Sequence, residues 1–491
     1  MKKNVILEEI LAEVDKHPEI MSRREALKYL TVSPLAASIL AGATVGATSA
    51  VASNAKGKIV IVGGGLAGMS TAARLNNTLS DADITIIEPN PLSTSYQPGQ
   101  TLVAAGLWEK NDILYNRDDY LPSGVKLIKG SVTAFDPKNN KVTVDDAEEV
   151  TYDQLIVATG VELNYGKIKG LKGITTSADA DSSVVKSGGV GKDGVYSLYF
   201  ANGAEDTWKG IQELIEKAKA HTGSQKLQAL FTHPATPIKC GGAPKKIMYL
   251  THARLEEAGV RDKVELIFYP NGQSMFGVPE YHEAILQQYK DRDFKWHYAH
   301  NLVEIDTANK IAIFKHHWQE KGEYDKDLEE YSMVNKNERV EVKYDFIHIT
   351  PPMQAPKVVA TSEIGSEKGW VPVTKETLQH VKFSNVWSLG DVAAIPMGKT
   401  GGSVRKQYKV LVDNIVASME GKSALPSAYG GYTVCPLITG IGTVMLAEFD
   451  WSKKPTPSFP LDPTKERWIW WLLKVYALKP MTMYGMLSGR A

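Results

Sequence analysis

The feature that most constrains the fold is a glycine-rich turn between a predicted strand and a predicted helix. A β-branched run, 58–62, leads into Gly-Gly-Gly-Leu-Ala-Gly, and helix-compatible residues 69–75 follow. A second apolar run, 83–87, ends in Glu88, 20 residues after Gly68. This order is typical of a dinucleotide-binding βαβ unit, in which glycines allow close approach to a pyrophosphate and the acidic residue accepts from ribose hydroxyls. The residues expected to line this turn are Gly63, Gly65, Leu66, Ala67 and Gly68.

Two later strand ends indicate which dinucleotide is bound. Residues 152–160 form a predicted strand that ends in Ala-Thr-Gly, with Thr159 and Gly160 at its end, and residues 385–391 end in Gly-Asp. With these motifs the sequence resembles the flavoprotein disulfide-reductase superfamily. That resemblance implies an α/β fold with two Rossmann-like domains, FAD at the first glycine motif, and contact between Asp391 and FAD.

The middle of the chain has a Rossmann-like outline without a second glycine motif. Strand 227–231, a helix from about 244 to 257 and strand 264–269 form a further predicted βαβ unit, with Pro244 at a favourable first helical position. No GxGxxG follows the first of these strands; the stretch there contains Cys240. NAD(P)H is therefore not the expected reductant.

The chain contains two cysteines, Cys240 and Cys435, 195 residues apart. They are too few for a disulfide framework and too distant for a CxxC redox or zinc motif, so no metal site is predicted. Cys240 directly precedes the predicted helix, and Lys239, Lys245 and Lys246 are close in sequence, which favours a reactive thiolate. Cys435 lies in a stretch punctuated by Gly and Pro. From these residues alone, two unrelated buried cysteines remain an alternative.

Several separate stretches resemble the sulfide:quinone oxidoreductases. The resemblance extends from Lys58 to the C-terminus and implies that Cys240 and Cys435 form a redox-active pair beside the flavin. Many members have a third cysteine; this chain is similar to the two-cysteine type. Lys399 is a candidate both for binding FAD and for stabilising negative charge on its reduced ring, although a plain solvated lysine remains open. The stretches that carry the resemblance are 237–247, 349–353, 399–407, 432–437 and 446–450.

The resemblance implies an oxidoreductase that converts sulfide to sulfane sulfur or polysulfide and passes two electrons to a membrane quinone. One alternative is the flavin subunit of a flavocytochrome c sulfide dehydrogenase, in which a cysteine bonds FAD covalently. Residues 93–99 contain no cysteine, so FAD is expected to be non-covalent. A type II NADH dehydrogenase is a further alternative, but it would need the second glycine motif. Proton donors are not identified; His233 and His282 are the only suggestions.

The C-terminal residues 467–491 have the composition of a membrane-surface segment. The apolar run from Trp468 to Leu478 has 11 residues, contains Lys474 and is expected to end at Pro480, so it is too short to span a bilayer as one helix. Three Trp, with flanking Lys and Arg, are typical of an interfacial anchor. A core helix with a crowded aromatic face is the alternative.

The N-terminus resembles a twin-arginine export signal. Residues 22–28 read Ser-Arg-Arg-Glu-Ala-Leu-Lys, and the weakly hydrophobic run 29–50 has no charge. It ends in a small-x-small pattern, so cleavage is expected after Ala52. A retained membrane anchor is the alternative. The expected location is therefore the periplasmic face of the cytoplasmic membrane.

The expected domains follow from these motifs. Lys plus Arg and Asp plus Glu are each 56, so the zero net charge argues against a nucleic-acid partner. The expected partners are sulfide, a membrane quinone, the lipid surface and, as an option, further copies of this chain. The predicted divisions are a signal at 1–52, an FAD domain at 53–165 and 355–425, a second Rossmann-like domain at 166–354, and a C-terminal region at 426–491.

Overall fold

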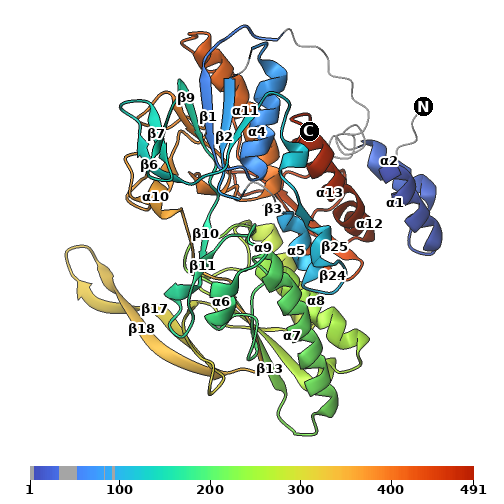
Figure 1. Cartoon of the computed structure of the whole chain (residues 1–491). Coiled ribbons are helices and arrows are strands. Elements are labelled where there is room, and N and C mark those ends of the chain that lie inside the picture. Colours follow the sequence, from blue (N-terminus) through green and yellow to red (C-terminus); the bar gives the residue numbers. More distant parts are fainter. Residues whose placement is uncertain (1–4, 33–51, 82, 91–93) are drawn as a thin grey trace. The chain divides into compact units, whose positions relative to one another are not determined.

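The computed structural model describes residues 5–32, 52–81, 83–90 and 94–491 (Figure 1). The chain divides into two units, which are treated separately below. Unit 1 comprises Met1–Pro98, Leu114–Glu162 and Gln354–Ala491, and unit 2 comprises Gly99–Ile113 and Leu163–Met353.

Unit 1 contains a parallel sheet with strand order β22-β9-β1-β2-β5. The glycine turn joins strand β1 to helix α4, as the sequence predicts, and β1 pairs in register with β2 from Lys58 opposite Asp83 onward. Residues 59–62 are at most 4% exposed, as expected for a strand of a parallel sheet buried on both faces. The elements are β1 (Lys58–Val62), α4 (Leu66–Thr78), β2 (Asp83–Ile87), β5 (Lys126–Ile128), β9 (Gln154–Val157) and β22 (Val386–Ser388).

The other elements of unit 1 surround this sheet. Helix α11 packs against α4, and three strands, β6 to β8, form an antiparallel sheet. The bounds are β3 (Thr94–Ser95), β4 (Leu114–Tyr115), η3 (Asp118–Tyr120), β6 (Val132–Asp136), β7 (Lys141–Val144), β8 (Glu148–Thr151), α10 (Lys357–Ala360), β21 (Val371–Pro372), η6 (Gly390–Val392), β23 (Ala393–Ala394) and α11 (Gly401–Met419).

Unit 2 contains a second parallel sheet, with strand order β12-β19-β13-β14-β15. Its β13, α8 and β14 form the Rossmann-like outline expected from the sequence, and the predicted α/β fold class with parallel sheets is confirmed. The bounds are α5 (Gln100–Val103), η2 (Lys110–Asp112), η4 (Tyr165–Lys167), α6 (Ser183–Ser187), β12 (Val195–Tyr196), α7 (Ala201–Ala220), β13 (Leu227–His233), α8 (Ala243–Glu257), η5 (Arg261–Lys263), β14 (Val264–Pro270), α9 (Pro279–Asp291), β15 (Lys295–Trp296) and β19 (Phe346–His348).

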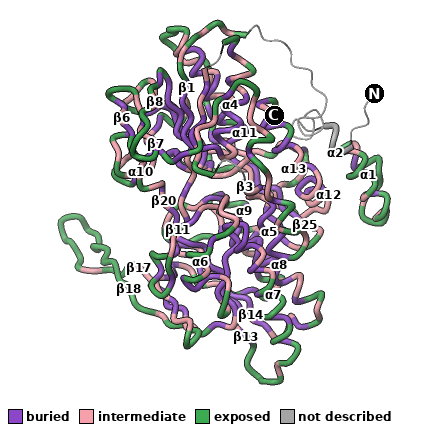
Figure 2. Tube along the Cα trace, viewed as in Figure 1, coloured by how far each residue is buried: buried purple, intermediate pink, exposed green. Residues whose placement is uncertain are grey.

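A long two-stranded ribbon projects from unit 2 (Figure 1). It consists of β17 and β18, which belong to an antiparallel sheet with order β16-β17-β18. Most residues of the ribbon are exposed (Figure 2). The bounds are β16 (His300–Asp306), β17 (Ile311–Asp325) and β18 (Glu330–Lys343), and a further small sheet contains β10 (Glu162–Asn164), β11 (Ile174–Thr175) and β20 (Met353–Gln354).

The C-terminal segment forms a nearly continuous helical run, and the expectation that Pro480 ends it is wrong. The run passes through Pro480 because two π-helical turns flank it, which shifts the backbone hydrogen bonds that a proline would otherwise break. Thr482 also donates its hydroxyl to the Leu478 carbonyl at 2.9 Å. The bounds are β24 (Thr433–Gly440), β25 (Thr443–Phe449), α12 (Trp468–Leu472), η7 (Leu473–Ala477), α13 (Leu478–Pro480) and η8 (Met481–Met486).

Much of this C-terminal run belongs to the core of unit 1. Trp470 is 3% exposed and its ring lies 4.5 Å from that of Phe459. Lys474 is also buried and donates to the Pro98 carbonyl at 2.5 Å. In contrast, Trp468 and Trp471 are half-buried and Tyr484 is 67% exposed. The aromatic composition therefore serves the core as well as the surface.

Two helices precede the body of unit 1: α1 (Val5–Lys16) and α2 (Arg23–Val32). Helix α1 contacts η7, and His17 packs edge-on against Trp468 at 5.6 Å. Arg23 forms ion pairs with Asp15 at 2.9 Å and Glu8 at 3.6 Å. Most of the weakly hydrophobic run of the expected signal lies outside the described residues. Among the residues that are described, no helix is both long and apolar enough to cross a membrane.

Candidate functional site

The glycine turn is shaped by backbone contacts that leave no room for side chains. Gly63 has φ +103°, and a Cβ there would lie 2.5 Å from the Ala158 carbonyl oxygen. A Cβ on Gly68 would lie 1.9 Å from the Gly63 carbonyl oxygen. Both positions therefore require glycine so that helix α4 can start against the end of β1.

Gly65 is different because the space above it is open. It is the N-cap of the 13-residue helix α4, has φ −75°, and an added Cβ would meet nothing within 4 Å. No side chain caps this helix terminus. The first backbone N–H groups of α4, which include those of Leu66 and Ala67, are therefore available to an anionic group at this end.

Glu88 and Arg117 hold the turn from the side. The Gly64 N–H donates to Glu88 Oε2 at 2.7 Å, and Arg117 Nε donates to the Gly64 carbonyl at 2.6 Å. Arg117 Nη1 lies 3.8 Å from Glu88, is buried, and has no hydrogen-bond partner among the described atoms. Sequence analysis predicts Glu88 but missed Arg117, which follows no recognisable motif and reaches the turn only through the tertiary fold.

The end of β9 lies next to the glycine turn because β9 and β1 are parallel neighbours. Carboxyl ends of parallel strands meet at one edge of the sheet, where open α/β folds bind ligands. Thr159 Oγ1 is buried without a described partner, and Gly160, with φ +68°, has open space where a Cβ would point. The structure thus brings Thr159 and Gly160 to the same edge as the glycine turn.

Lys399 is tied to the Gly-Asp turn. Its Nζ donates to the carbonyls of Asp391 at 2.5 Å and Ala393 at 3.1 Å, and lies 4.2 Å from the centre of the Trp370 ring. Burial lowers the pKa of Lys399 to about 8, and the charge of Asp391 opposes this shift. Lys399 is therefore not the solvated lysine that was the alternative; it fixes the loop that carries Asp391.

Cys240 is held in a strained backbone conformation just before helix α8. Its φ is +50°, which is uncommon for a residue other than glycine, and its carbonyl accepts from the Ala243 N–H at 2.8 Å. The thiol is half-buried, and Lys246 Nζ lies 3.6 Å from Sγ. Lys239 and Lys245 are also buried nearby in sequence. The structure therefore brings a lysine side chain to a partly accessible sulfur.

Cys435 lies on β24 in unit 1 and is 7% exposed. It pairs across the hairpin with Ala447, next to Glu448. Glu448 is 1% exposed and accepts hydrogen bonds from Tyr432 at 2.5 Å and from the Ser458 hydroxyl at 2.6 Å. Cys240 belongs to unit 2, and the structure has both cysteines as thiols.

The two histidines suggested as proton donors have other surroundings. Burial, with a contribution from Lys245, lowers the pKa of His233 to about 3, so this ring is neutral near neutral pH. His282 Nδ1 accepts from the Met275 N–H at 3.0 Å.

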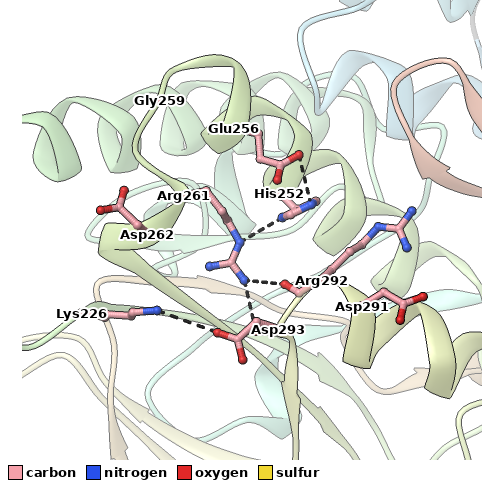
Figure 3. A pocket seen from close by; sticks show the side chains of 9 residues that line it. All are labelled: Lys226, His252, Glu256, Gly259, Arg261, Asp262, Asp291, Arg292 and Asp293. Carbon is pink, nitrogen blue, oxygen red and sulfur yellow. Dashed lines mark hydrogen bonds and ion pairs between the residues drawn. The ribbon is translucent and has the colours of Figure 1, made fainter.

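A pocket of about 830 Å³ in unit 2 does not belong to this site. It lies at the amino ends of β13 and β14, whereas Cys240 follows the carboxyl end of β13. Arg261 is one of the residues that line it (Figure 3), and it donates to His252 at 2.9 Å and to the Arg292 carbonyl at 2.9 Å. Burial and the charges of Arg261 and Arg292 lower the pKa of His252 to about 4. The pocket is a structural network of mixed charge.

Comparisons with known proteins agree with this arrangement. Residues 57–188 match the family model described as pyridine nucleotide-disulphide oxidoreductase, which places the chain in the class of flavoprotein disulfide-reductase folds. The chain is 38% identical over 435 residues to the mitochondrial sulfide:quinone oxidoreductase of Dictyostelium discoideum, and this match covers 88% of this chain and 86% of the relative. The mitochondrial sulfide:quinone oxidoreductase of Mus musculus is 34% identical, with the same coverage.

The fold is also found in a solved structure. The sulfide:quinone oxidoreductase from Aquifex aeolicus superimposes with a TM-score of 0.66 at 20% identity, covering 89% of this chain and 92% of that one. From the identity and coverage of the curated relatives, the chain belongs to the sulfide:quinone oxidoreductase family of oxidoreductases, and a flavin cofactor is implied. The open space above Gly65 and the orphaned groups of Arg117 and Thr159 fit such a cofactor.

The two glycines at 65 and 68 provide a test of the cradle. We expect Gly65→Ala to leave the stability of the protein nearly unchanged but to reduce the bound flavin at least tenfold, because the new methyl group meets only the space reserved for the cofactor. Gly68→Ala should instead lower the free energy of unfolding by about 3 kcal/mol, since backbone must move. Visible flavin absorbance per mole of protein and urea denaturation would measure the two effects. Normal flavin content in Gly65→Ala would contradict this placement.

The role of Lys246 can be tested through the reactivity of Cys240. Replacing Lys246 with Met removes the positive charge that lies 3.6 Å from the sulfur, so alkylation of Cys240 at pH 7 should slow by about tenfold. Lys246→Arg keeps the charge and serves as the matched control. Mass spectrometry of the labelled peptide after timed iodoacetamide treatment gives the rate. Equal rates in all three proteins would remove Lys246 from the site.

Proposed function

We propose that this chain oxidises sulfide and transfers two electrons to a membrane quinone, using Cys240 and Cys435 as a redox-active pair. The observation that carries the proposal is the setting of Cys240: a half-buried sulfur before α8 with an ammonium group 3.6 Å away, in a member of the sulfide:quinone oxidoreductase family. The alternative of two unrelated buried cysteines does not explain that setting.

The proposed reaction starts from the oxidised pair. Hydrosulfide attacks the Cys240–Cys435 disulfide, so a new S–S bond forms to Cys435 while the bond between the cysteines breaks. Cys435 then carries a persulfide and Cys240 is a thiolate, which the charge of Lys246 stabilises. A nucleophilic acceptor, such as a second hydrosulfide, takes the outer sulfur from Cys435 and leaves a second thiolate there. Re-forming the disulfide from both thiolates releases two electrons.

The flavin supplies the route for those electrons, because it accepts two and is reoxidised by quinone. We assign it as non-covalent FAD, since residues 93–99 lack the cysteine that a covalent link would need. The cofactor-binding residues are those of the predicted set, with Arg117 added. Lys399, which is half-buried and bound to the Asp391 carbonyl, positions this loop and would place positive charge near an anionic reduced ring. The full set is Gly63, Gly65, Leu66, Ala67, Gly68, Glu88, Arg117, Thr159, Gly160, Asp391 and Lys399.

A quinone that dissolves only in lipid requires an enzyme at the membrane surface. We assign this contact to the C-terminal residues 467–491, with Trp471 and Tyr484 as the side chains that reach outward. The twin-arginine signal predicted within residues 1–52 would direct the protein to the periplasmic face of the cytoplasmic membrane. Loss of periplasmic protein on replacing Arg23 and Arg24 by Lys would support the twin-arginine route, and unchanged export would refute it.

Serine variants of the two cysteines test the proposed chemistry. Cys240→Ser and Cys435→Ser should each lower the rate of flavin bleaching by anaerobic sulfide at least a hundredfold, because a disulfide requires both sulfurs. Flavin content should stay normal, since neither residue belongs to the glycine cradle. Stopped-flow absorbance measures the rate, and NADH serves as a negative control with the wild-type protein. Near-normal sulfide bleaching in either variant would refute the paired mechanism.

The membrane contact can be tested by replacing half-buried Trp471 and exposed Tyr484, because deleting the segment would also remove core side chains such as Trp470. The double variant Trp471→Ser/Tyr484→Ser should reduce co-flotation with lipid vesicles about tenfold, whereas flavin bleaching by sulfide should be unchanged. A matched control, Val184→Ser/Val381→Ser, removes two exposed apolar side chains elsewhere. Equal flotation of both double variants and the wild type would place the membrane contact in another part of the chain.

A further inference from the structure

The outer edge of β18 carries no strand pairing in the described part of the chain. In the sheet order β16-β17-β18, the last strand has only β17 as a neighbour over its 14 residues. The ribbon also extends beyond β16, whose pairing with β17 stops at His316. A long open edge of this kind is a template for another strand, and proteins usually shorten, cover or pair it.

The tip of the same ribbon is exposed (Figure 2), and several of its exposed side chains are apolar. Of the eleven large hydrophobic side chains that are exposed in the described residues, five lie within residues 324–334. A cluster of exposed apolar side chains on a projecting element indicates an interaction surface, whereas single exposed apolar side chains are common on any protein. These five are Tyr324 (48%), Leu328 (67%), Tyr331 (48%), Met333 (54%) and Val334 (40%).

We infer that this edge pairs with the same edge of a second copy of the chain, β18 against β18 in antiparallel orientation. In such a pair the two-fold axis is perpendicular to the sheet, so residues that lie opposite each other are on the same face. Because side chains alternate between the two faces along a strand, two opposite residues are both odd-numbered or both even-numbered, and their numbers add to an even sum. One register stands out, with Asn337 opposite its own copy. It is selected by charge complementarity along the strand.

In this register, opposite residue numbers add to 674. Lys336 then faces Glu338 of the second copy, and the two-fold axis repeats this opposite-charge pair. Val334 faces Val340, which gives an apolar pair on the same face as the charges. Tyr331 faces Lys343, which brings an aromatic ring of the tip to the base of the other ribbon.

The neighbouring registers are disfavoured. Moving the axis to Lys336 or to Glu338 places that residue directly opposite its own copy, and like charges in direct opposition destabilise a sheet. Within one chain, Glu338 already lies 3.0 Å from His316 and Lys336 pairs across the ribbon with Trp318. The Glu338 side chain is therefore positioned by β17 before a second copy binds. Pairing over 331–343 would form about a dozen backbone hydrogen bonds between copies.

The first experiment is a charge reversal with rescue, read by sedimentation of the full-length protein in one detergent. The wild type should be dimeric at micromolar concentration, and Lys336→Glu should raise the dimer dissociation constant at least tenfold because the new carboxylate would face that of Glu338 in the other copy. The double variant Lys336→Glu/Glu338→Lys restores opposite charges and should restore the dimer. Lys326→Glu, in the tip turn with no strand partner, is the matched control and should behave as the wild type.

The second experiment tests the register itself. Asn337→Cys places two identical thiols opposite each other on the axis, so mild oxidation should link most of the protein into covalent dimers. Asp327→Cys is equally exposed in the tip but lies far from its own copy, and it should give no more cross-linking than the wild type with its native cysteines. A monomeric wild type, or a dimer that neither Lys336→Glu nor Asn337→Cys affects, would overturn the inference.

Discussion

The close approach of the first turn of α4 to the end of β1 is the constraint on which the rest of unit 1 depends. A Cβ on Gly68 would lie 1.9 Å from the Gly63 carbonyl oxygen, so the helix can start there only without a side chain. Because α4 starts at that point, its N–H groups open onto the edge where β1, β9 and β22 end. Arg117 and Glu88 then bind the Gly64 backbone and keep the turn in place. The glycine turn, the Thr159 end and the Asp391 turn therefore share one edge, which is the arrangement that a dinucleotide needs.

How much of this the sequence predicts depends on how local the signal is. The glycine turn and the α/β class are indicated by residues that are consecutive in the sequence, and the structure confirms both predictions. Arg117 is not predictable because its partner, Gly64, is distant in sequence and no motif surrounds it. Pro480 misleads for a different reason: proline ends an ordinary α-helix, but π-type turns on either side accommodate it. Composition also fails to predict which side chains of this segment are buried. Trp470 lies in the core and Trp471 lies near the surface, although they are the same residue type in consecutive positions.

The distribution of exposed apolar side chains differs between the C-terminal run, for which lipid contact is proposed, and the β17–β18 ribbon, for which pairing with a second copy is proposed. In the C-terminal run most large side chains are buried in unit 1, and among the described residues Tyr484 is the one large apolar side chain of this run that is exposed. The lipid contact proposed for this run would therefore involve few side chains, which is compatible with a well-packed core. The ribbon in unit 2 has the opposite character, because five exposed apolar side chains accompany an unpaired strand edge with alternating charge. Backbone pairing supplies geometric specificity there, whereas a lipid surface requires none.

The buried lysines give the strongest physical link between structure and chemistry. Lysine is rarely buried, because removing an ammonium group from water is costly unless a partner compensates. Lys239, Lys245 and Lys246 are each at most 4% exposed near Cys240. Lys399 is half-buried at the Asp391 turn, where desolvation lowers its pKa to about 8. A scaffold selected only for stability would gain from apolar side chains at these positions. The anionic sulfur species and the reduced flavin ring of the proposed reaction would gain from buried positive charge. Partners within the protein already compensate for this burial in part, because Lys245 donates to the Gly241 carbonyl and Lys399 donates to the Asp391 and Ala393 carbonyls.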